Sequence, residues 1–592
     1  MNLEADIKKG IANAFKDLFD RSLPIENISL QPTRKEFEGT HTFVVFPFLK
    51  FTHKKPEESA HLIGRFLLKN CPVIDEFNVV KGFLNLKLNH QVWLGTFKHI
   101  IKEKEYGVQS KIGKKVMVEF SSPNTNKPLH LGHLRNIFLG DSVSRILVAA
   151  GYEVMKTNLV NDRGIHICKS MVAYQKFGKG ETPETSGIKG DHLVGKYYVV
   201  FDQHYKTEIE VLVAQGMERE KAEKEAPLLL EAQGMLKKWE DNDAEVRSLW
   251  EQMNNWVYEG FDTTYSNMGI SFDRIYKESV TYLLGKEDIA EGLKKEVFFK
   301  KENGSIWADL TQYGLDEKLV LRADGTSVYI TQDIGTSDYK YRDFSFDKSV
   351  YVVGNEQDYH FQVLFNIMKD LGRDYADGMY HLSYGMVDLP TGKMKSREGT
   401  VVDADDLIEE MIETAAQQTK ALSKTESFTE AEARQLFHKV GLGALKYFLL
   451  KVDPKKNILF NPAESIEFQG NTGPFIQYTY ARIAAIIRRA KTLDIQLEEV
   501  DFPEKLNEKE LGIIRIIEQF PITIQNAAKE YSPASIAQYA HELAKTYNSF
   551  YQEVPIFKDN EYAAFKIILS RTVAQTIRTS MGLLGIEVPE RM

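Results

Sequence analysis

Cysteine is nearly absent from this 592-residue chain, which contains only Cys71 and Cys168. Two cysteines cannot build a disulfide framework, and because no C-x-x-C pair occurs, a thiolate zinc site of the usual kind is excluded as well. We therefore expect no zinc, and a reducing compartment, the cytoplasm, as the location of the protein.

Long apolar runs are lacking too. No stretch of 18 apolar residues occurs, so we expect no membrane span and no membrane partner. Glu4, Asp6 and Asp17 interrupt the N-terminal segment, which excludes a signal or transit peptide. The net charge of −9 argues against a uniformly basic nucleic-acid binder, although a local basic surface remains compatible with it.

The order of the periodic patterns predicts three domains, as expected for a chain of this length. Residues 1–110 form a small α/β unit, with a first helix from Ile7 to Phe19, a strand in 42–51, a helix in 57–68 and paired strands in 77–88. Residues 111–403 alternate strands with helices, which predicts an α/β domain with a parallel sheet of βαβ units and a charged helical insertion at about 179–290. Residues 404–592 read as a bundle of six helices, the fourth split at Pro521.

The strands expected in the parallel sheet can be taken in chain order. After the first strand at Val116–Phe120, we expect the second at 151–161. Beyond the insertion, the sheet should resume with 298–310, 319–329 and 349–354. The alternation of Val116, Val118 and Phe120 is typical of a half-buried strand.

The stretch Lys115–Arg145 reads as a strand, a loop and a helix that starts near His130-Leu-Gly-His133. A helix N-terminus presents free N–H groups and suits a phosphate, and Gly132 lets a ligand approach the backbone. Taken alone, the two histidines fit equally well a pair of ordinary hydrogen-bonded residues.

A second motif, Lys393-Met-Lys395-Ser396-Arg397, lies in a loop after the last strand. Together with His130 and His133 it would bracket one nucleotide, at the carboxyl ends of the strands. Fixed cations help most as charge accumulates on the departing pyrophosphate. The two motifs predict nucleotidyl transfer from ATP to a carboxylate.

The motifs resemble the HIGH and KMSKS signatures of class I aminoacyl-tRNA synthetases, and more closely the arginyl-tRNA synthetase family. The matching segments span roughly residue 80 to the C-terminus: Glu119–Asn124, Lys127–Asn136, Leu321–Ile334, Gln357–His360, Lys393–Arg397, Gly443–Phe448, Gln477–Arg482 and Val588–Met592.

This resemblance implies a two-step reaction in which arginine attacks the α-phosphate of Mg-ATP and the arginyl group then passes to tRNA. It further implies a Rossmann-type parallel-sheet catalytic domain, an N-terminal domain that touches the tRNA elbow, a helical anticodon-binding domain and a first step that needs bound tRNA. We expect a monomer without an organic cofactor, whose partners are arginine, ATP and tRNA.

The family pattern assigns residues to each substrate. A guanidinium is planar, always charged and has five donors, so it calls for a carboxylate and several neutral acceptors. Asp333 is the expected carboxylate, and the alternative is that it only caps a helix.

The expected arginine-binding residues are Glu119, Ser122, Asn124, Tyr329, Asp333 and Gln357. The expected ATP-binding residues are His130, Gly132, His133, Met386, Val387, Lys393 and Arg397. The expected catalytic residues are Lys127, His130, His133, Lys393, Lys395 and Ser396, and the expected tRNA-binding residues are Phe83, Asn85, Gln477, Tyr478 and Arg482.

The loop departs from the family pattern at one position. Where KMSKS has its second lysine, this chain has Ser396, and Lys395 precedes it. Either Lys395 acts from a shifted register, or Lys127 reaches the phosphates from the opposite side.

Other functions remain as alternatives. A catalytically silent tRNA-binding regulatory paralogue would not need both histidines, the KMKSR loop and Asp333. A cysteinyl-tRNA synthetase would need a zinc thiolate site, and a glutamate enzyme would want cations in place of Asp333.

Overall fold

A computed structural model describes residues 3–34, 36–388, 402–421, 428–498, 500–557 and 562–592. The chain divides into two compact units. The first comprises 1–106, 483–520 and 543–576, and the second comprises 107–482, 521–542 and 577–592. The three predicted domain boundaries stay a prediction. Among the described residues, no helix combines the length and the apolarity needed to cross a bilayer.

The first unit holds a four-stranded antiparallel sheet of order β1-β2-β4-β3. Ile7, Ile11 and Phe15 on the first helix are fully buried, as the helical spacing predicts. The strand expected over 42–51 ends early at Val44, and a helical turn at Leu49–Thr52 follows. The elements are α1 (Leu3–Phe19), β1 (Leu30–Pro32), β2 (His41–Val44), α2 (Leu49–Thr52), α3 (Pro56–Asn70), β3 (Ile74–Val80), β4 (Phe83–Leu88), α4 (His90–Ile100) and α20 (Glu508–Glu518).

The second unit is built on the predicted parallel sheet, whose order is β12-β11-β5-β6-β7. The chain passes from β5 to β6 and β7 on one side and returns to β11 and β12 on the other. The sheet therefore reverses its direction of growth at β5, and ligands of such sheets bind at the carboxyl ends beside this point. Its strands are β5 (Lys115–Glu119), β6 (Glu153–Val160), β7 (Arg274–Lys277), β11 (Lys348–Gly354) and β12 (Met379–Tyr384).

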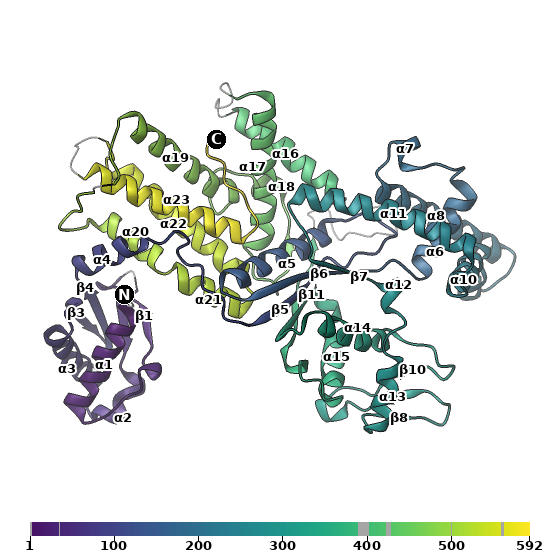
Figure 1. Ribbon diagram of the computed structural model, residues 1–592, viewed down its shortest axis with the longest axis horizontal. Helices are drawn as coiled ribbons and strands as arrows, with labels where there is room; N and C mark the ends of the chain where they lie inside the picture. The colour runs from purple at the N-terminus through teal and green to yellow at the C-terminus, as the bar shows by residue number, and fades with distance from the viewer. Residues whose placement is uncertain (1–2, 35, 389–401, 422–427, 499, 558–561) are drawn as a thin grey trace. The chain divides into compact units, whose positions relative to one another are not determined.

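Helices cover both faces of this sheet. Figure 1 shows α5 (Leu131–Ala149) on one side and α14 (Tyr329–Phe344) and α15 (Asp358–Asp370) on the other. Met117 and Tyr351 belong to the apolar cluster formed with α14 and α15. Val116, Met117 and Val118 are all fully buried, so the expectation of a half-buried strand is wrong. A central strand covered on both faces has no solvent side.

Two segments expected to continue the parallel sheet form a separate antiparallel sheet of order β10-β9-β8. Its strands are β8 (Phe298–Lys300), β9 (Ile306–Ala308) and β10 (Lys318–Leu321). Asn303-Gly304, with Gly304 at φ +89°, turns the chain between β8 and β9, because a tight hairpin favours this pair of residues. Tyr329 begins α14 instead of ending a strand, and the fifth parallel position belongs to β7.

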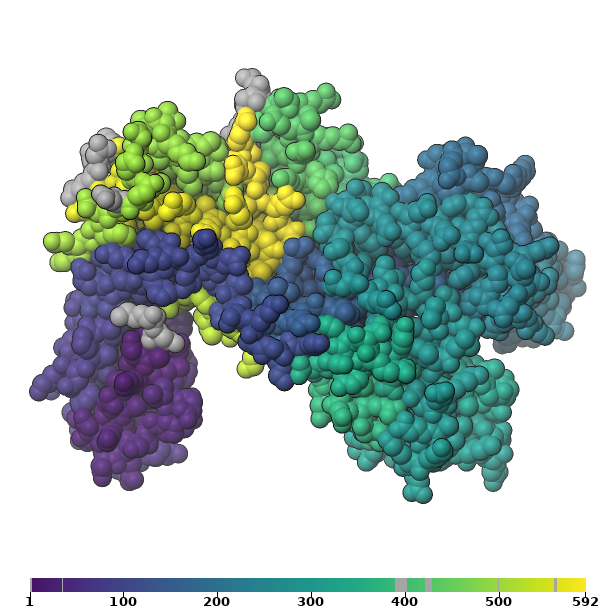
Figure 2. Space-filling model, viewed as in Figure 1, coloured from purple at the N-terminus to yellow at the C-terminus, as the bar shows by residue number. Residues whose placement is uncertain are grey.

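The charged segment after β6 is helical, as predicted. Its helices between residues 165 and 268 form one closely packed body in Figure 2, whereas the helix at 286–294 lies beside β8 (Figure 1). The expected surface loop at 179–190 contains a short helix, Pro183–Ser186. The helices are α6 (Ile165–Phe177), α7 (Pro183–Ser186), α8 (Gly190–Ala214), α9 (Arg219–Glu225), α10 (Pro227–Glu240), α11 (Ala244–Met268), α12 (Glu278–Thr281) and α13 (Lys286–Lys294).

In its described residues, the C-terminal third contains helices and one short strand. β14 (Ile458–Leu459) pairs in parallel with β13 (Val387–Asp388), so the expectation that strands stop at residue 404 is wrong for this pair. The predicted break at Pro521 is confirmed, since one helix ends at Glu518 and the next begins at Phe520. The remaining helices are α16 (Ala404–Ala421), α17 (Glu430–Leu450), α18 (Pro462–Ser465), α19 (Gly473–Thr492), α21 (Phe520–Glu530), α22 (Pro533–Glu553) and α23 (Ala563–Leu583).

Candidate active site at the switch point of the parallel sheet

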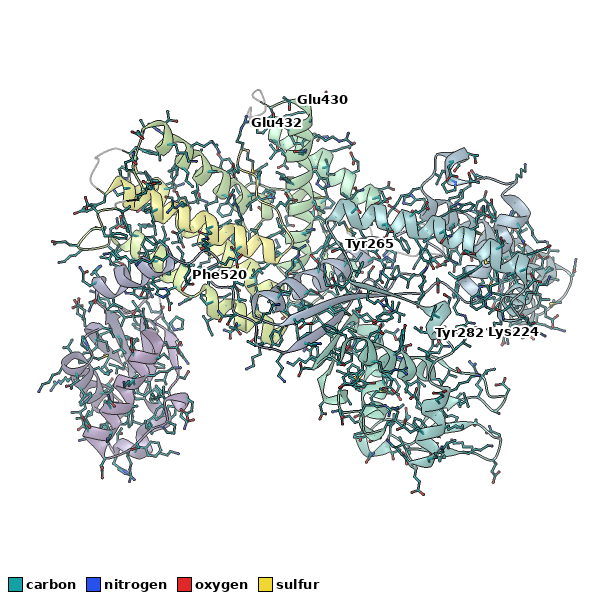
Figure 3. The ribbon with its side chains drawn as sticks, in the orientation of Figure 1. Lys224, Tyr265, Tyr282, Glu430, Glu432 and Phe520 are labelled. Carbon is teal, nitrogen blue, oxygen red and sulfur yellow. The ribbon has the colours of Figure 1, made fainter. Side chains whose placement is uncertain are left out.

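The chain leaves β5 through two serines in the left-handed region, Ser121 at φ 75° and Ser122 at φ 43°. Such backbone is unfavourable for residues with a side chain and persists only where surrounding bonds fix it. Ser121 N donates to Asn136 Oδ1 at 2.5 Å, and Ser122 N donates to Asn158 Oδ1 at 3.1 Å. Tyr265, labelled in Figure 3, bonds Ser121 Oγ through its hydroxyl at 2.6 Å. The loop after the central strand is thus held at the carboxyl edge of the sheet.

The loop is also tied to the end of β6. Asn161 Nδ2 donates to Asn124 Oδ1 at 2.8 Å, while Thr125 N donates to Asn161 O at 3.0 Å. Asn124 therefore occupies a fixed place beside the strand ends, and its amide N–H donors are directed by this bond.

The last residue of β5, Glu119, is buried and forms an ion pair with Lys340 of α14. Burial alone would lower the pKa of Lys340, but attraction by Glu119 raises it above its ordinary range. Lys340 is therefore charged at neutral pH. A substrate ammonium at Glu119 would share this carboxylate with Lys340.

The start of α5 forms what we call the nucleotide turn, residues 127–133. His130 caps the helix, and its Nδ1 accepts from Gly132 N at 3.2 Å. His133 Nδ1 accepts from His130 N at 3.1 Å, and the ring centroids are 3.9 Å apart. With each Nδ1 accepting, the proton of each neutral ring is on Nε2, which is left to donate to a ligand.

Burial lowers the pKa of His130 to about 3, and the charge of Lys127 lowers it further in the same direction. The pKa of His133 lies well below the ordinary value for the same reasons. Without a bound anion, neither imidazole therefore contributes positive charge. They are neutral N–H donors, and the positive charge at this turn comes from Lys127.

Arg135 ties α5 to two distant segments. Its guanidinium is only 2% exposed and donates to main-chain carbonyls alone. The acceptors are Gly385 O at 2.5 Å, Met386 O at 3.2 Å, Asp453 O at 3.4 Å, Pro454 O at 3.0 Å and Lys456 O at 2.7 Å. Met386 and Val387, which were expected to bind ATP, are thereby held next to the helix that carries the nucleotide turn.

The chain also returns to this turn at the far end of the KMKSR segment. Leu131 N donates to Val402 O at 3.1 Å, and Ala404 N donates to Leu129 O at 3.0 Å. His130 and Asp403 pair as an isolated antiparallel bridge. Lys393, Lys395, Ser396 and Arg397 lie outside the described residues, but the described residues on either side of them meet α5.

The residues expected to bind the guanidinium lie on α14 and at the start of α15. Tyr329 begins α14 and is 78% exposed, and Asp333 lies one turn further along the same helix. Asp333 therefore lies inside the helix, and the alternative that it caps a helix is wrong. Its Oδ2 accepts from His360 Nε2 at 2.7 Å, and Gln357 is exposed directly before α15.

Glu278 joins Asp333 in what we call the carboxylate pair. It follows β7 at the carboxyl edge of the sheet, and burial raises its pKa to about 7, with repulsion from Asp162 and Asp333 adding to the rise and Arg163 opposing it. Within the described part of the chain, no group donates a hydrogen bond to this carboxyl. A half-buried carboxyl near another carboxylate favours a cationic ligand.

Sequence reasoning missed Glu278 because it missed β7. Four residues, Arg274–Lys277, are too few for a clear period, and nothing local marks the glutamate that follows them. Asp162 fixes the segment by accepting from Ser279 N at 2.8 Å and from Ser279 Oγ at 2.7 Å. Arg163 lies 3.9 Å from the centroid of Tyr282, which Figure 3 labels beside α12.

The expected tRNA-binding residues differ in exposure. Asn85 is buried and donates to Asn78 Oδ1 at 2.7 Å, and Gln477 is fully buried and donates to Lys439 O and Glu587 O. Phe83 is half-buried, and Arg482 lies 4.9 Å from the centroid of Tyr478. Contact of Asn85 or Gln477 with RNA stays a prediction, and it would require these side chains to leave their present partners.

Comparison with known families matches most of this chain. Residues 96–461 match the family described as tRNA synthetases class I (R), catalytic domain, and residues 476–592 match the DALR anticodon binding domain. The nucleotide turn, the carboxylate pair and the KMKSR segment all fall within the first match.

Full-length relatives agree with the domain matches. The chain is 58% identical to the arginine–tRNA ligase of Amoebophilus asiaticus and 54% identical to that of Bacteroides thetaiotaomicron, with complete coverage of both chains in each case. Among solved structures, it resembles the arginyl-tRNA synthetase of Thermus thermophilus, with a TM-score of 0.80 at 23% identity and complete coverage of both chains. That of Plasmodium falciparum gives a TM-score of 0.78 at 20% identity, over all of this chain and 99% of the other. At these identities the two structures bear on the fold alone.

Proposed function

The chain belongs to the class I arginyl-tRNA synthetase family, and we propose that it ligates L-arginine to its tRNA in two steps through arginyl-adenylate. The observation that carries this proposal is that segments far apart in the chain meet at the start of α5. Met386 and Val402, which lie on either side of the KMKSR segment, meet the helix that begins at His130, beside the carboxyl end of the central strand. The comparisons give no support to the regulatory alternative.

In the proposed first step, Mg-ATP lies on the nucleotide turn. The Nε2–H groups of His130 and His133 donate to phosphate oxygens. The first N–H groups of α5 already have partners in Val402 O, His130 Nδ1 and His130 O, so they would have to exchange these for a phosphate. The backbone at Met386 and Val387 faces the adenine, and Gly132 allows the nucleotide to approach. Lys127, Lys393, Lys395 and Arg397 stabilise the departing pyrophosphate, and Ser396 donates a hydrogen bond to it.

Arginine enters with its guanidinium at the carboxylate pair. Asp333 is oriented by His360, and Glu278 supplies a second carboxylate. Tyr329 stacks on the planar group and Gln357 accepts from it. A lysine would leave acceptors unpaired, which is costly in a built polar pocket. Glu119, Ser122 and Asn124 hold the α-ammonium and direct the substrate carboxylate towards the α-phosphorus.

In the second step, the terminal adenosine hydroxyl of tRNA attacks the arginyl carbonyl and AMP leaves. Phe83 and Asn85 contact the tRNA elbow, and Gln477, Tyr478 and Arg482 contact the anticodon side. We further propose that the first step needs bound tRNA. The enzyme acts as a cytoplasmic monomer, without zinc and without an organic cofactor.

ATP–pyrophosphate exchange with each amino acid, with and without total tRNA, tests this function. We expect exchange with arginine only, and only when tRNA is present. Exchange driven by lysine or glutamate would contradict the proposed substrate, and equal exchange without tRNA would contradict the proposed tRNA requirement.

The identity of the lysine that acts on the phosphates needs a separate comparison. Lys127→Ala and Lys395→Ala are assayed side by side in the same exchange reaction, and the variant with the larger loss identifies the working lysine. Equal, mild losses in both would contradict either single-lysine account.

A further inference from the structure

A cluster of five ionisable groups lies where α8 and α11 meet the start of α16, outside the residues assigned to substrates. Lys189 Nζ is 2.5 Å from Asp405 Oδ2, 3.2 Å from Asp191 Oδ2 and 2.5 Å from Thr264 Oγ1. His192 Nε2 is 3.3 Å from Asp403 Oδ2 and 3.4 Å from Asp405 Oδ2. Two cationic groups of α8 therefore face three carboxylates.

Asp191, His192 and Asp405 lie close enough to one another to share a metal ion. The ammonium group of Lys189 already supplies the positive charge between Asp191 and Asp405. A divalent ion would have to displace this ammonium, so the arrangement is that of an ion-pair network.

This network is joined to the nucleotide turn through Asp403. Asp403 Oδ1 caps α16 by accepting from Asp405 N at 2.8 Å and from Asp406 N at 3.3 Å. The backbone of Asp403 pairs with His130, and its neighbours on either side bond Leu129 and Leu131. Whatever holds Asp403 therefore also holds the first turn of α5.

We propose that His192 and Lys189 are positioning residues for the nucleotide. Their ion pairs with Asp403 and Asp405 hold residues 402–405 against 129–131, so that ATP affinity depends on the charge of His192. This inference rests on the proposed function only in assigning ATP to the nucleotide turn.

The electrostatic surroundings of His192 favour its charged form. Its ion pair with Asp405 raises its pKa, burial lowers it, Asp403 and Asp191 raise it and Lys189 lowers it, and the net shift is upward. From α11 the facing side chain is Thr264, which does not ionise. His192 is charged below its raised pKa and loses its charge as the pH rises through that value. The ion pairs then weaken, and ATP affinity falls.

The site histidines do not obscure this dependence. The pKa of His130 is about 3 and that of His133 is also far below the ordinary value, so neither changes its charge around neutrality. Ionisation of ATP itself is the same for every variant. A difference between two variants therefore isolates the contribution of position 192.

The test measures Mg-ATP affinity of the full-length protein by calorimetry, without arginine, from about pH 6 to about pH 9. In His192→Asn we expect affinity about threefold to tenfold weaker than wild type at the acidic end, and similar at the alkaline end. In His192→Lys, which keeps a charge throughout, the affinity should stay near the acidic wild-type value. His204→Asn is the matched control, because His204 is exposed on the same helix and stacks on Phe177.

His192→Asn with wild-type affinity at every pH would overturn the inference, and so would an equal loss in His204→Asn. If His192→Asn does not fold, His192→Lys decides, since a wild-type pH step in that variant would also overturn it. Loss of arginine-dependent exchange by the wild type, with the ATP pH step intact, would reject the proposed function and leave the positioning role standing.

Discussion

The nucleotide turn and the carboxylate pair lie at the same edge of one sheet, and they are prepared for their ligands in opposite ways. In the turn, each histidine Nδ1 accepts a main-chain N–H, and burial keeps both rings neutral. In the pair, burial raises the pKa of Glu278 to about 7, and repulsion from Asp162 and Asp333 adds to the rise. The turn offers oriented hydrogen-bond donors, whereas in the pair the ionised form of Glu278 is disfavoured until a cation binds.

This difference means that ATP and arginine are bound by different physical effects. A polyanion can be bound by oriented donors without any change in protonation of the protein. A guanidinium at the carboxylate pair must also bring Glu278 into its ionised form. Arginine binding should therefore respond to the protonation of a group in its own pocket and to charge-removing substitutions there. ATP binding should respond mainly to the geometry of the turn, including the part of it that the ion pairs of His192 hold.

The largest effect is expected when the oriented carboxylate is removed. Asp333→Asn should lower kcat/KM for arginine about 100-fold to 1000-fold, in line with about 3–4 kcal/mol for losing one partner of a buried charge pair. The KM for ATP should change less than about twofold. Steady-state exchange kinetics give both constants, and Asp374→Asn, at an exposed aspartate, is the matched control. An equal rise in both KM values would contradict the separation of the two regions.

A substitution of Arg135 should disturb the geometry of the nucleotide turn. In Arg135→Lys, one ammonium cannot span carbonyls from two segments, and each buried carbonyl left unpaired costs about 1–3 kcal/mol. We expect a lower melting temperature and a rise of at least about tenfold in the KM for ATP. Arg145→Lys is the control, because Arg145 bonds the single partner Asp141 at 2.6 Å. A melting temperature and a KM equal to those of the control would show that the carbonyl clamp is dispensable.

The role of Glu278 ionisation in arginine binding can be tested by varying the pH. Glu278 is protonated below a pKa of about 7, and the bound guanidinium favours the ionised form, so the KM for arginine should rise as the pH falls below that value. Glu278→Gln should raise the KM about tenfold near neutral pH and flatten this dependence. Glu287→Gln, at an exposed glutamate, should keep the wild-type profile. A pH profile unchanged by Glu278→Gln would exclude Glu278 from guanidinium binding.

The smallest effect is expected at Gly132. A Cβ there would lie 3.0 Å from His130 Cε1 and 3.2 Å from Nδ1, so the ring must shift by a few tenths of an ångström. We expect Gly132→Ala to raise the KM for ATP about twofold to fivefold, with the KM for arginine unchanged. In the control Gly95→Ala, the added Cβ meets nothing within 4 Å. A KM for ATP no higher than in the control would show that the turn tolerates this shift.

Local pattern was sufficient for much of the fold. The strand, loop and helix of residues 115–149 follow from apolar spacing, and Pro521 marked a real break between helices. Pairing partners did not follow, since a strand pattern at 298–310 does not say which strand lies beside it. The Asn303-Gly304 turn favours a hairpin, and β8 and β9 pair with each other accordingly.

The charge states at the candidate site also lay beyond the sequence. Nothing in the tetrad beginning at His130 indicates that burial will keep both rings neutral. The pKa of Glu278 is raised first by burial and then by Asp162 and Asp333, which lie far from it in the chain, while Arg163 opposes the rise. Such properties arise only when the strand ends meet.

Arg135 has a consequence for how this sequence can vary. All five of its acceptors are main-chain carbonyls, so the clamp requires the path of the backbone at 385–386 and 453–456 but no particular side chain there. Apart from Gly385, where an added Cβ would lie 2.7 Å from Lys456 C, the side chains at these positions can change while the clamp persists, provided that no insertion or deletion alters the spacing. The number of residues in these two segments is therefore constrained more strongly than the identity of their side chains.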